Sequence, residues 1–386
     1  MLINYINKLR IVLKVVLKAR KVFSLPSQNN LIILEQTGKQ KIVDHVLGHN
    51  DFQVMSSKYK IINIPILILS IFSIHRYKKF FYEVTYIKYV NAKFALTWID
   101  NSYQYCQIIK HIPSCKLGLI QNGRSDDSRF KFFKFKKLEC DYYFINGEFV
   151  KSYFEKNIST KFIVSGSPIA NNFNLGKFEK ITKIKWISHF RNFSKIKKES
   201  PELDIQNYYV KPVENSLKEV YAFCIKHDLS FEVLGRTKSQ DEYLFHKHII
   251  GEDVKVIPND LSRSSYKSYE LLSNDSIIAG LDSQLLYEAF GIGYRTAFFT
   301  TRSFYFNDKS LRFAWPKKTE DTGPFWTNIP EKKNIKSILN YLMNVQETEW
   351  KKQLVKFEGV MFHNPSNKII RNVLAKENVK LSQLKF

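Results

Sequence analysis

Residues 276–301, SIIAGLDSQLLYEAFGIGYRTAFFTT, have the pattern of a strand, a tight turn, a short helix and a second strand. Ile277 and Ile278 form a short apolar run, and Asp282 or Ser283 is placed to cap a helix. Apolar residues then recur at helical spacing before two glycines: Leu285, Leu286, Ala289, Phe290, Gly291 and Gly293. A second apolar run begins at Thr296. The stretch therefore predicts a βαβ unit.

Polar residues lie where the first strand of this unit ends and its helix begins. In open α/β sheets, ligands bind in the crevice at this position. The positive end of the helix dipole and the free N–H groups of the first turn suit a phosphate, and Ser283 adds a hydroxyl. Glu288 is placed to accept hydrogen bonds from two ribose hydroxyls. In the alternative interpretation, Asp282 and Ser283 only cap the helix and Glu288 is solvated.

Length and composition limit the class of protein. With 386 residues the chain is long enough for two domains, and its hydrophobic content of 44% excludes a disordered protein. Sixty basic and 36 acidic residues give a formal charge of +24, which favours an anionic partner. Nucleic acid, an anionic membrane surface and a phosphorylated substrate all fit. A compositional bias of the source genome is the alternative explanation of the lysine excess.

The sequence predicts no metal site and no bound cofactor. The four cysteines have no C-x-x-C spacing, which indicates reduced thiols in a cytosolic protein. His246 and His248 would share a face of a strand, but no third ligand is apparent. No D-x-D motif follows a strand, no G-x-x-x-x-G-K-[ST] loop occurs, and the only candidate for a dinucleotide fingerprint lacks the glycine spacing. These absences argue against a kinase or a nicotinamide enzyme.

The first 28 residues are apolar and basic, and they predict an amphipathic helix. Their longest uncharged run is too short to span a bilayer, and no cleavage site of a signal peptide follows. Such a helix either lies on anionic lipid or packs on its own domain. A second apolar stretch, Ile61–Ile74, is interrupted by Pro65, and we expect a buried strand and helix there.

Two series of alternating strands and helices follow, which predicts two parallel sheets covered on both faces. We expect a first domain over residues 29–170, a second over 171–365, and a C-terminal helix over 366–386. A polar segment after Ser167 separates the two series, and we expect a charged loop from Arg191 to about residue 210.

In the second series, three strand ends converge if the sheet is doubly wound. Together they offer what an activated nucleotide needs, because two guanidinium groups can clamp phosphate oxygens. The predicted nucleotide-binding residues are Ser188, His189, Arg191, Gly235, Arg236, Asp282, Ser283 and Glu288. Taken singly, Arg236 also fits an ordinary surface turn and His189 a structural histidine.

The first series offers carboxylates at or near its strand ends. Asp100, Glu35 and Glu148 are the candidates for a general base or nucleophile, and Asp100 is favoured because it directly follows a buried strand. A helix cap is the alternative role for Asp100. Asn122 and Gly123 follow another strand and are predicted to lie on the acceptor side.

Five segments resemble a bacterial family of surface carbohydrate biosynthesis proteins. The resemblance extends from about residue 30 to 330 and rests on these motifs: FALTWIDN (94–101), IQNG (120–123), WISHFR (186–191), LGR (234–236) and DSQLLYEA (282–289). Two departures from the family pattern stand out, since His189 replaces a more usual Gln and Glu35-Gln36 replaces an Asp-Ser-like pair. The last motif also occurs in glycerophosphotransferases of teichoic acid synthesis and in capsule Kdo transferases.

The resemblance implies a metal-independent glycosyltransferase of the GT-B architecture, with two Rossmann-like domains facing a cleft. It implies a nucleotide-sugar donor in the second domain and a lipid-linked or polysaccharide acceptor in the first. It also implies a role in lipopolysaccharide, O-antigen or capsule assembly, peripheral on the cytosolic face of the inner membrane. Two alternatives are a polyol-phosphate transferase that uses a donor like CDP-glycerol and a basic nucleic-acid-binding protein.

Overall fold

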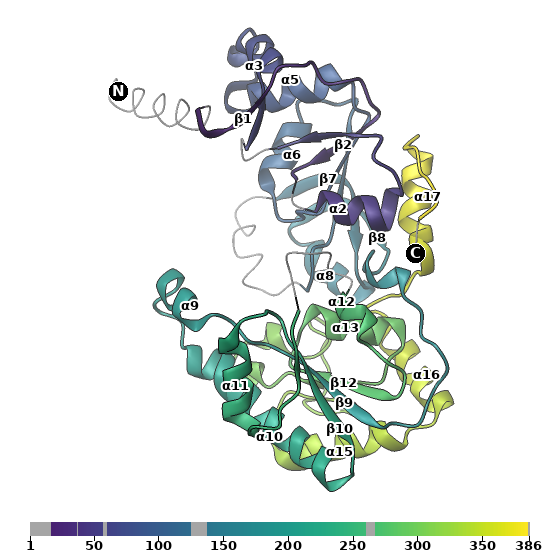
Figure 1. Cartoon of the computed structure of the whole chain (residues 1–386). Coiled ribbons are helices and arrows are strands. Elements are labelled where there is room, and N and C mark those ends of the chain that lie inside the picture. Colours follow the sequence, from purple (N-terminus) through teal and green to yellow (C-terminus); the bar gives the residue numbers. More distant parts are fainter. Residues whose placement is uncertain (1–16, 37, 57–59, 125–136, 260–266, 385–386) are drawn as a thin grey trace.

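The computed structural model describes residues 17–36, 38–56, 60–124, 137–259 and 267–384, which fold as two α/β domains stacked one above the other (Figure 1). Each domain is built on a six-stranded sheet in which every strand pair is parallel. The predicted fold class, two doubly wound parallel sheets, is confirmed.

The first sheet has the strand order β3-β2-β5-β6-β7-β8. Its strands are β2 (Leu31–Leu34), β3 (Gln53–Met55), β5 (Phe94–Thr97), β6 (Lys116–Ile120), β7 (Leu138–Ile145) and β8 (Ile158–Val164). The chain adds β3 on one side of β2 and all later strands on the other, so the topological switch point lies between β2 and β5. The strands β2 and β5, which flank the switch point, are buried at every residue because helices cover both faces of the sheet.

The helices of the first domain are α2 (Lys39–Ile42), α3 (Ile64–Ile71), α4 (Ile74–Tyr77), α5 (Phe81–Val90), α6 (Tyr103–Ile109) and α8 (Lys151–Phe154), with a π-helical turn at Val43–Leu47 and a 3-10 turn, η4, at Glu148–Val150. A separate two-stranded sheet pairs β1 (Arg20–Val22) with β4 (Ile61–Asn63).

The helix predicted over residues 1–28 is wrong at Arg20–Val22, which form β1. Residues 1–16 of that prediction lie outside the described residues. Parallel pairing with β4 satisfies the backbone of β1, and this nonlocal contact overrides the helical periodicity.

The stretch Ile61–Ile74 folds as a strand and a helix, as predicted, but the helix is not buried. Only Ile66 and Ser70 of α3 are buried, and several apolar side chains of the helix and the following turn are exposed. Periodicity did not reveal this, because a helix that is apolar on every side shows no polar face to mark the solvent side.

The second sheet has the order β11-β10-β9-β12-β13-β14, and its switch point lies between β9 and β12. Its strands are β9 (Lys183–Ile187), β10 (Ser230–Leu234), β11 (Val256–Ile257), β12 (Ser276–Gly280), β13 (Thr296–Phe299) and β14 (Trp326–Thr327). Its helices are α9 (Phe193–Glu199), α10 (Lys211–Lys226), α11 (Gln240–Ile250), α12 (Lys267–Glu270), α13 (Gln284–Ile292), α14 (Arg302–Tyr305), α15 (Lys332–Asn344) and α16 (Glu347–Lys356). The predicted βαβ unit is confirmed as β12, α13 and β13. Gly293, at φ 115°, ends α13 in the left-handed conformation that favours glycine.

Two segments of the second domain differ from the prediction. The segment expected as a charged loop contains α9, which the Asn192 side chain caps by accepting the Lys195 N–H at 2.9 Å, and a π-helical turn, η6 (Gln206–Val210). His246 and His248 lie on α11, so they do not share a face as they would on a strand.

The C-terminal segment returns to the first domain, where α17 (Lys368–Lys376) lies beside it (Figure 1). The Arg371 guanidinium donates to the Val46 carbonyl at 2.5 Å, and Lys116 forms an ion pair with Glu377 at 2.8 Å. The helix expected over 366–386 therefore ends at residue 376, followed by irregular chain. Within the described parts of the chain, no helix combines the length and apolarity needed to cross a bilayer.

Candidate active site

A cavity of about 450 Å³ opens at the carboxyl ends of β9, β10 and β12, on the side that faces the first domain. This is the switch point of the second sheet, where open α/β sheets bind ligands. Seven of the eight predicted nucleotide-binding residues line it: Ser188, His189, Arg191, Gly235, Arg236, Asp282 and Ser283. Its walls also carry residues that the sequence did not single out: Arg124, Tyr208, Tyr209, Asn259, Ser268, Gln284 and Arg302.

Asp282 is the centre of a buried charge cluster at this switch point. It follows β12, and the His189 ring, which follows the neighbouring β9, places Nε2 at 2.9 Å from its carboxylate. Arg124 Nη1 donates to Asp282 Oδ2 at 3.0 Å, and Arg302 Nη2 donates to the same oxygen. Burial alone would raise the pKa of Asp282, but these three groups outweigh it and hold the pKa well below its usual range. Asp282 therefore carries a charge that its neighbours already neutralise.

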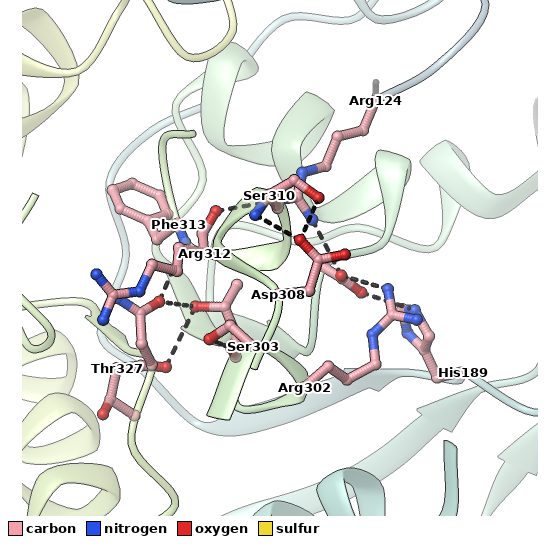
Figure 2. Close-up of polar contacts among 12 residues, drawn as sticks. Arg124, His189, Arg302, Ser303, Asp308, Ser310, Arg312, Phe313 and Thr327 are labelled. Atoms are coloured by element: carbon pink, nitrogen blue, oxygen red, sulfur yellow. Dashed lines mark hydrogen bonds and ion pairs between the residues drawn. The ribbon is translucent and has the colours of Figure 1, made fainter. Parts of the chain in front are cut away.

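His189 is held neutral next to that carboxylate. Burial lowers the pKa of the imidazole below its ordinary value of 6.5, although the hydrogen bond to Asp282 opposes this shift. Nε2 lies 2.9 Å from Asp282 Oδ1, and Nδ1 is buried with no hydrogen-bond partner among the residues that the structure describes. Figure 2 shows the His189 and Arg302 side chains lying next to each other with their nitrogen ends on the same side.

Arg191 and Arg236 line the cavity, and neither forms an ion pair with a described residue of the chain. No carboxylate in the described parts of the chain lies within ion-pair distance of either guanidinium, and Arg191 Nε is buried without a hydrogen-bond partner. Burial, together with the nearby charge of Arg191, lowers the pKa of Arg236 to about 10. Two adjacent cations that lack a counter-charge favour an anionic ligand in this cavity.

Glu242, on α11, accepts hydrogen bonds from residues that follow two strands at the cavity. Its carboxylate accepts hydrogen bonds from the Ser188 hydroxyl, from the Arg236 N–H at 2.8 Å, and from the N–H and hydroxyl of Thr237. His246, one turn later, lies 3.0 Å from the Ser188 hydroxyl. One carboxylate thus fixes the carboxyl ends of both β9 and β10.

Glu242 is not among the predicted site residues, although the sequence carries a signal for it. Ser239 and Glu242 have the S-x-x-E spacing of a capping box, and the Ser239 hydroxyl accepts the Asp241 N–H at 3.1 Å. Arg124 and Arg302 carry no comparable local signal, since both reach Asp282 only through tertiary structure. Arg302 also lies 4.6 Å from the centre of the Tyr208 ring, which η6 brings to the cavity.

Glu288 does not line the cavity. It is buried in α13, where Oε1 accepts from the Ser167 hydroxyl and from Gln284 Nε2 at 2.9 Å, and Oε2 accepts from the Tyr269 hydroxyl. Burial raises the pKa of Glu288 despite these hydrogen bonds. Ser167 follows the last strand of the first sheet, so Glu288 connects the segment between the domains to α13. Its role as a ribose ligand stays a prediction.

The three candidate catalytic carboxylates lie outside the cavity wall. Asp100 is buried, and its Oδ2 accepts from the Asn122 N–H at 3.0 Å and from the Tyr143 hydroxyl at 2.8 Å. Glu35 is buried at φ 80° and accepts the Gln36 N–H at 3.1 Å. Glu148 is exposed and forms an ion pair with Lys151 at 3.0 Å. The catalytic roles stay predictions, and the structure does not bring these three residues together with the nucleotide-site residues.

The acceptor-side residues lie close to the second domain. Asn122 Oδ1 accepts from the Trp98 indole N–H at 3.1 Å, and Gly123 adopts φ 87°. A side chain at position 123 would come within 3.8 Å of Gln284 Oε1 on α13. The turn at 122–124 therefore carries Arg124 across to Asp282.

No group of three or more His, Cys, Asp or Glu residues in the described ranges is arranged to hold a metal ion. The four cysteines are free, and burial raises the pKa of the Cys106 thiol to about 11. Protonated, buried thiols are poor nucleophiles and metal ligands. The polar groups that line the cavity are arginines, hydroxyls and the His189–Asp282 pair.

Residues 118–378, more than half of the chain, match the model of a protein family described as "putative O-antigen biosynthesis protein". The chain belongs to this family. The resemblance to surface carbohydrate biosynthesis proteins is thereby confirmed, and the matched region of this O-antigen biosynthesis family contains the whole second sheet and its cavity. A comparison with curated proteins gives no match.

Solved structures share the fold at low sequence identity. A UDP-GlcNAc 2-epimerase from Neisseria meningitidis bound to UDP-GlcNAc has a TM-score of 0.52 at 12% identity, over 90% of this chain and 99% of that one. Another UDP-N-acetylglucosamine 2-epimerase has a TM-score of 0.51 at 11% identity, over 93% and 98%. The wall teichoic acid polymerase TagF aligns with a TM-score of 0.48 at 12% identity, over 91% and 89%. The two epimerases establish the two-domain GT-B-like architecture.

Proposed function

We propose that this protein is a glycosyltransferase that moves a sugar from a nucleotide-activated donor to a growing cell-surface polysaccharide or lipopolysaccharide, without a metal ion. The observation that carries the proposal is the pair Arg191 and Arg236, two guanidinium groups in the switch-point cavity with no carboxylate partner among the described residues. A nucleoside phosphate supplies the missing negative charge.

The donor phosphates would bind between these arginines and the N-terminus of α13. Ser283 stands at that N-terminus, and its side chain makes no cap hydrogen bond, so its hydroxyl is available to a phosphate oxygen. Positive charge at this place would stabilise the nucleoside phosphate as it leaves the sugar. Membership of an O-antigen biosynthesis family, together with the UDP-GlcNAc bound by the Neisseria relative of the same fold, supports a nucleotide-sugar as the ligand class.

His189 is the candidate general base that the cavity itself offers. Its Nε2 lies 2.9 Å from Asp282 Oδ1, and its buried Nδ1 would have to become exposed when the donor binds before it could take a proton from an acceptor hydroxyl. The pairing with Asp282 would stabilise the imidazolium that forms. Asp100, Glu35 and Glu148 remain the alternatives from the first domain.

Isothermal titration of the purified protein with UDP, GDP, CMP, CDP and dTDP, each with EDTA or with Mg²⁺, tests the donor site. We expect one nucleotide to bind equally in both conditions. Arg191→Gln and Arg236→Gln should each weaken that binding by roughly tenfold or more, because each removes a charge-assisted hydrogen bond. Arg76→Gln, at an exposed arginine far from the cavity, is the matched control.

Product analysis with the matching activated donor then decides the reaction. Sugar transfer to a lipid-linked or polysaccharide acceptor supports the proposal. Transfer of a polyol phosphate from CDP-glycerol, or epimerisation of the free nucleotide-sugar, would replace it with another reaction at the same cavity. Nucleotide binding that Arg191→Gln and Arg236→Gln leave unchanged would place the donor site elsewhere.

A further inference from the structure

The helix α3 lies at the end of the first domain farthest from the second domain (Figure 1). Large apolar side chains are exposed there. They belong to α3, to the turn after it and to the start of α4: Ile68, Leu69, Ile71, Phe72 and Ile74. Phe72 is 86% exposed and Ile68 is 55% exposed. Apolar side chains on the outer face of α3 do not stabilise the fold while they face water. An exposed apolar patch of this kind marks a surface that binds another molecule or a membrane.

A second apolar segment lies beside the first. β1 pairs in parallel with β4, which leads directly into α3, and Asn63 Nδ2 donates to the Ser24 carbonyl at 2.7 Å. Phe23 and Leu25, which follow β1, are also exposed. We call Phe23, Leu25, Ile68, Leu69, Ile71, Phe72 and Ile74 the distal apolar patch.

The exposed charges on the segments that carry the distal apolar patch are all positive. The exposed basic residues of the segments that carry the patch are Lys18, Arg20, Lys21, Lys60, Arg76, Lys78 and Lys79. The sequence contains no Asp or Glu in residues 1–34 or 52–82, and the next acid, Glu83, is buried. An apolar surface whose own segments carry basic residues and no exposed acidic ones is complementary to the headgroups of an anionic bilayer.

We propose that the distal apolar patch docks the protein on an anionic lipid bilayer. Its apolar side chains enter the boundary between headgroups and acyl chains, and the surrounding lysines and arginines contact lipid phosphates. The same charges argue against the other occupants. A second copy of this patch, or residues 1–16 with their three basic and no acidic residues, brings positive charge onto a positive surface.

Vesicle flotation with the full chain tests this proposal, independently of any donor chemistry. Vesicles of phosphatidylcholine alone are compared with vesicles that also contain phosphatidylglycerol, at low and high salt. The test variant is Ile68→Ser with Phe72→Ser, and Ile225→Ser is the matched control, because Ile225 is 67% exposed on the second domain. A charge variant, Lys78→Gln with Lys79→Gln, changes the basic residues alone.

We expect the wild type to float with the anionic vesicles and to be released by salt. The Ile68→Ser, Phe72→Ser variant should partition at least roughly tenfold more weakly, while Ile225→Ser partitions like the wild type. The lysine variant should lose affinity for anionic vesicles only. Melting temperatures equal to that of the wild type show that the variants are folded.

Three outcomes would overturn the proposal. The wild type could fail to bind anionic vesicles. The Ile68→Ser, Phe72→Ser variant could bind as well as the wild type, which would assign binding to another segment. Sedimentation could show a dimer of the wild type that this variant abolishes, which would make the patch an interface between copies.

Discussion

Arg124 and Asp282, 158 residues apart in the sequence, join the two domains through an ion pair at the cavity. Arg124 Nη1 lies 3.0 Å from the carboxylate, while Nη2 donates to the carbonyls of Ser310 at 2.7 Å and Arg312 at 2.9 Å (Figure 2). The guanidinium also lies over the Tyr287 ring at 5.3 Å. A side chain of the first domain thus completes the cavity of the second.

Arg124→Lys should weaken this connection. A single ammonium cannot reach the carboxylate and both carbonyls, so we expect the free energy of unfolding to fall by about 1–3 kcal/mol. Urea denaturation measures the loss, and X-ray scattering should show a larger radius of gyration as the domains separate. Lys151→Ala, which removes the exposed ion pair with Glu148, should leave stability nearly unchanged, because solvent screens exposed charge pairs. Equal losses in both variants would mean that Arg124 does not hold the domains together.

Glu242→Ala should destabilise the second domain and disorder its cavity. It leaves the Ser188 hydroxyl, two backbone N–H groups and the Thr237 hydroxyl without their acceptor, and we expect a loss of about 3 kcal/mol or more. Glu242→Gln, which keeps one acceptor oxygen, should lose about half as much. Nucleotide affinity should fall in both variants because Ser188 and Arg236 shift. Asp241→Ala is the control, because Asp241 is exposed and its removal takes away only a charge near the N-terminus of α11. Normal affinity in folded Glu242→Ala would contradict a positioning role.

His246 should make stability depend on pH between about 6.5 and 4. Burial lowers its pKa from 6.5 to about 4 in the folded protein, so the unfolded chain binds more protons throughout this window. Stability from this group is present above pH 6.5 and is lost as pH falls, by up to about 1.4 kcal/mol per pH unit. His246→Gln should flatten the dependence of unfolding free energy on pH, whereas His248→Gln, at the exposed histidine two residues later, should not. Parallel pH profiles for wild type and His246→Gln would refute this assignment.

Glu288→Ala separates a structural role from ribose binding. Its carboxylate accepts from Ser167, Tyr269 and Gln284, and removing it should lower the unfolding free energy by about 2–4 kcal/mol. If the contact with Ser167 is its whole role, the folded variant binds nucleoside phosphates as the wild type does. If it also holds the ribose, affinity falls for nucleoside phosphates and stays unchanged for pyrophosphate, which has no ribose. Titrations well below the melting temperature of the variant distinguish the two outcomes.

The sequence predicted the elements that local patterns define. The βαβ unit predicted within residues 276–301 folds as β12, α13 and β13, because its two strands are short apolar runs buried at every residue and two glycines follow the apolar residues of its helix. The helix α11 is not among the predicted elements, although Ser239 and Glu242 have the spacing of a capping box at its start.

The position of the cavity could be predicted from the topology of the second sheet. Once the sheet is parallel and doubly wound, the residues that follow its strands meet at one edge, so Ser188, Gly235 and Asp282 had to be neighbours. Glu288 departs from this expectation because it points into the protein, toward Ser167 and Tyr269. The direction of a helical side chain depends on what the helix packs against, and that partner is remote in the sequence.

The sequence by itself determined the fold class, two parallel sheets with polar strand ends, because hydrophobic periodicity and turn residues act over a few neighbouring positions. Only the tertiary structure decided which remote groups meet. It brought Arg124 and Arg302 to Asp282, returned α17 to the first domain and left the outer face of α3 exposed. These outcomes follow from the order of strands in the sheets and from interdomain packing, and both are set by contacts between residues far apart in the chain.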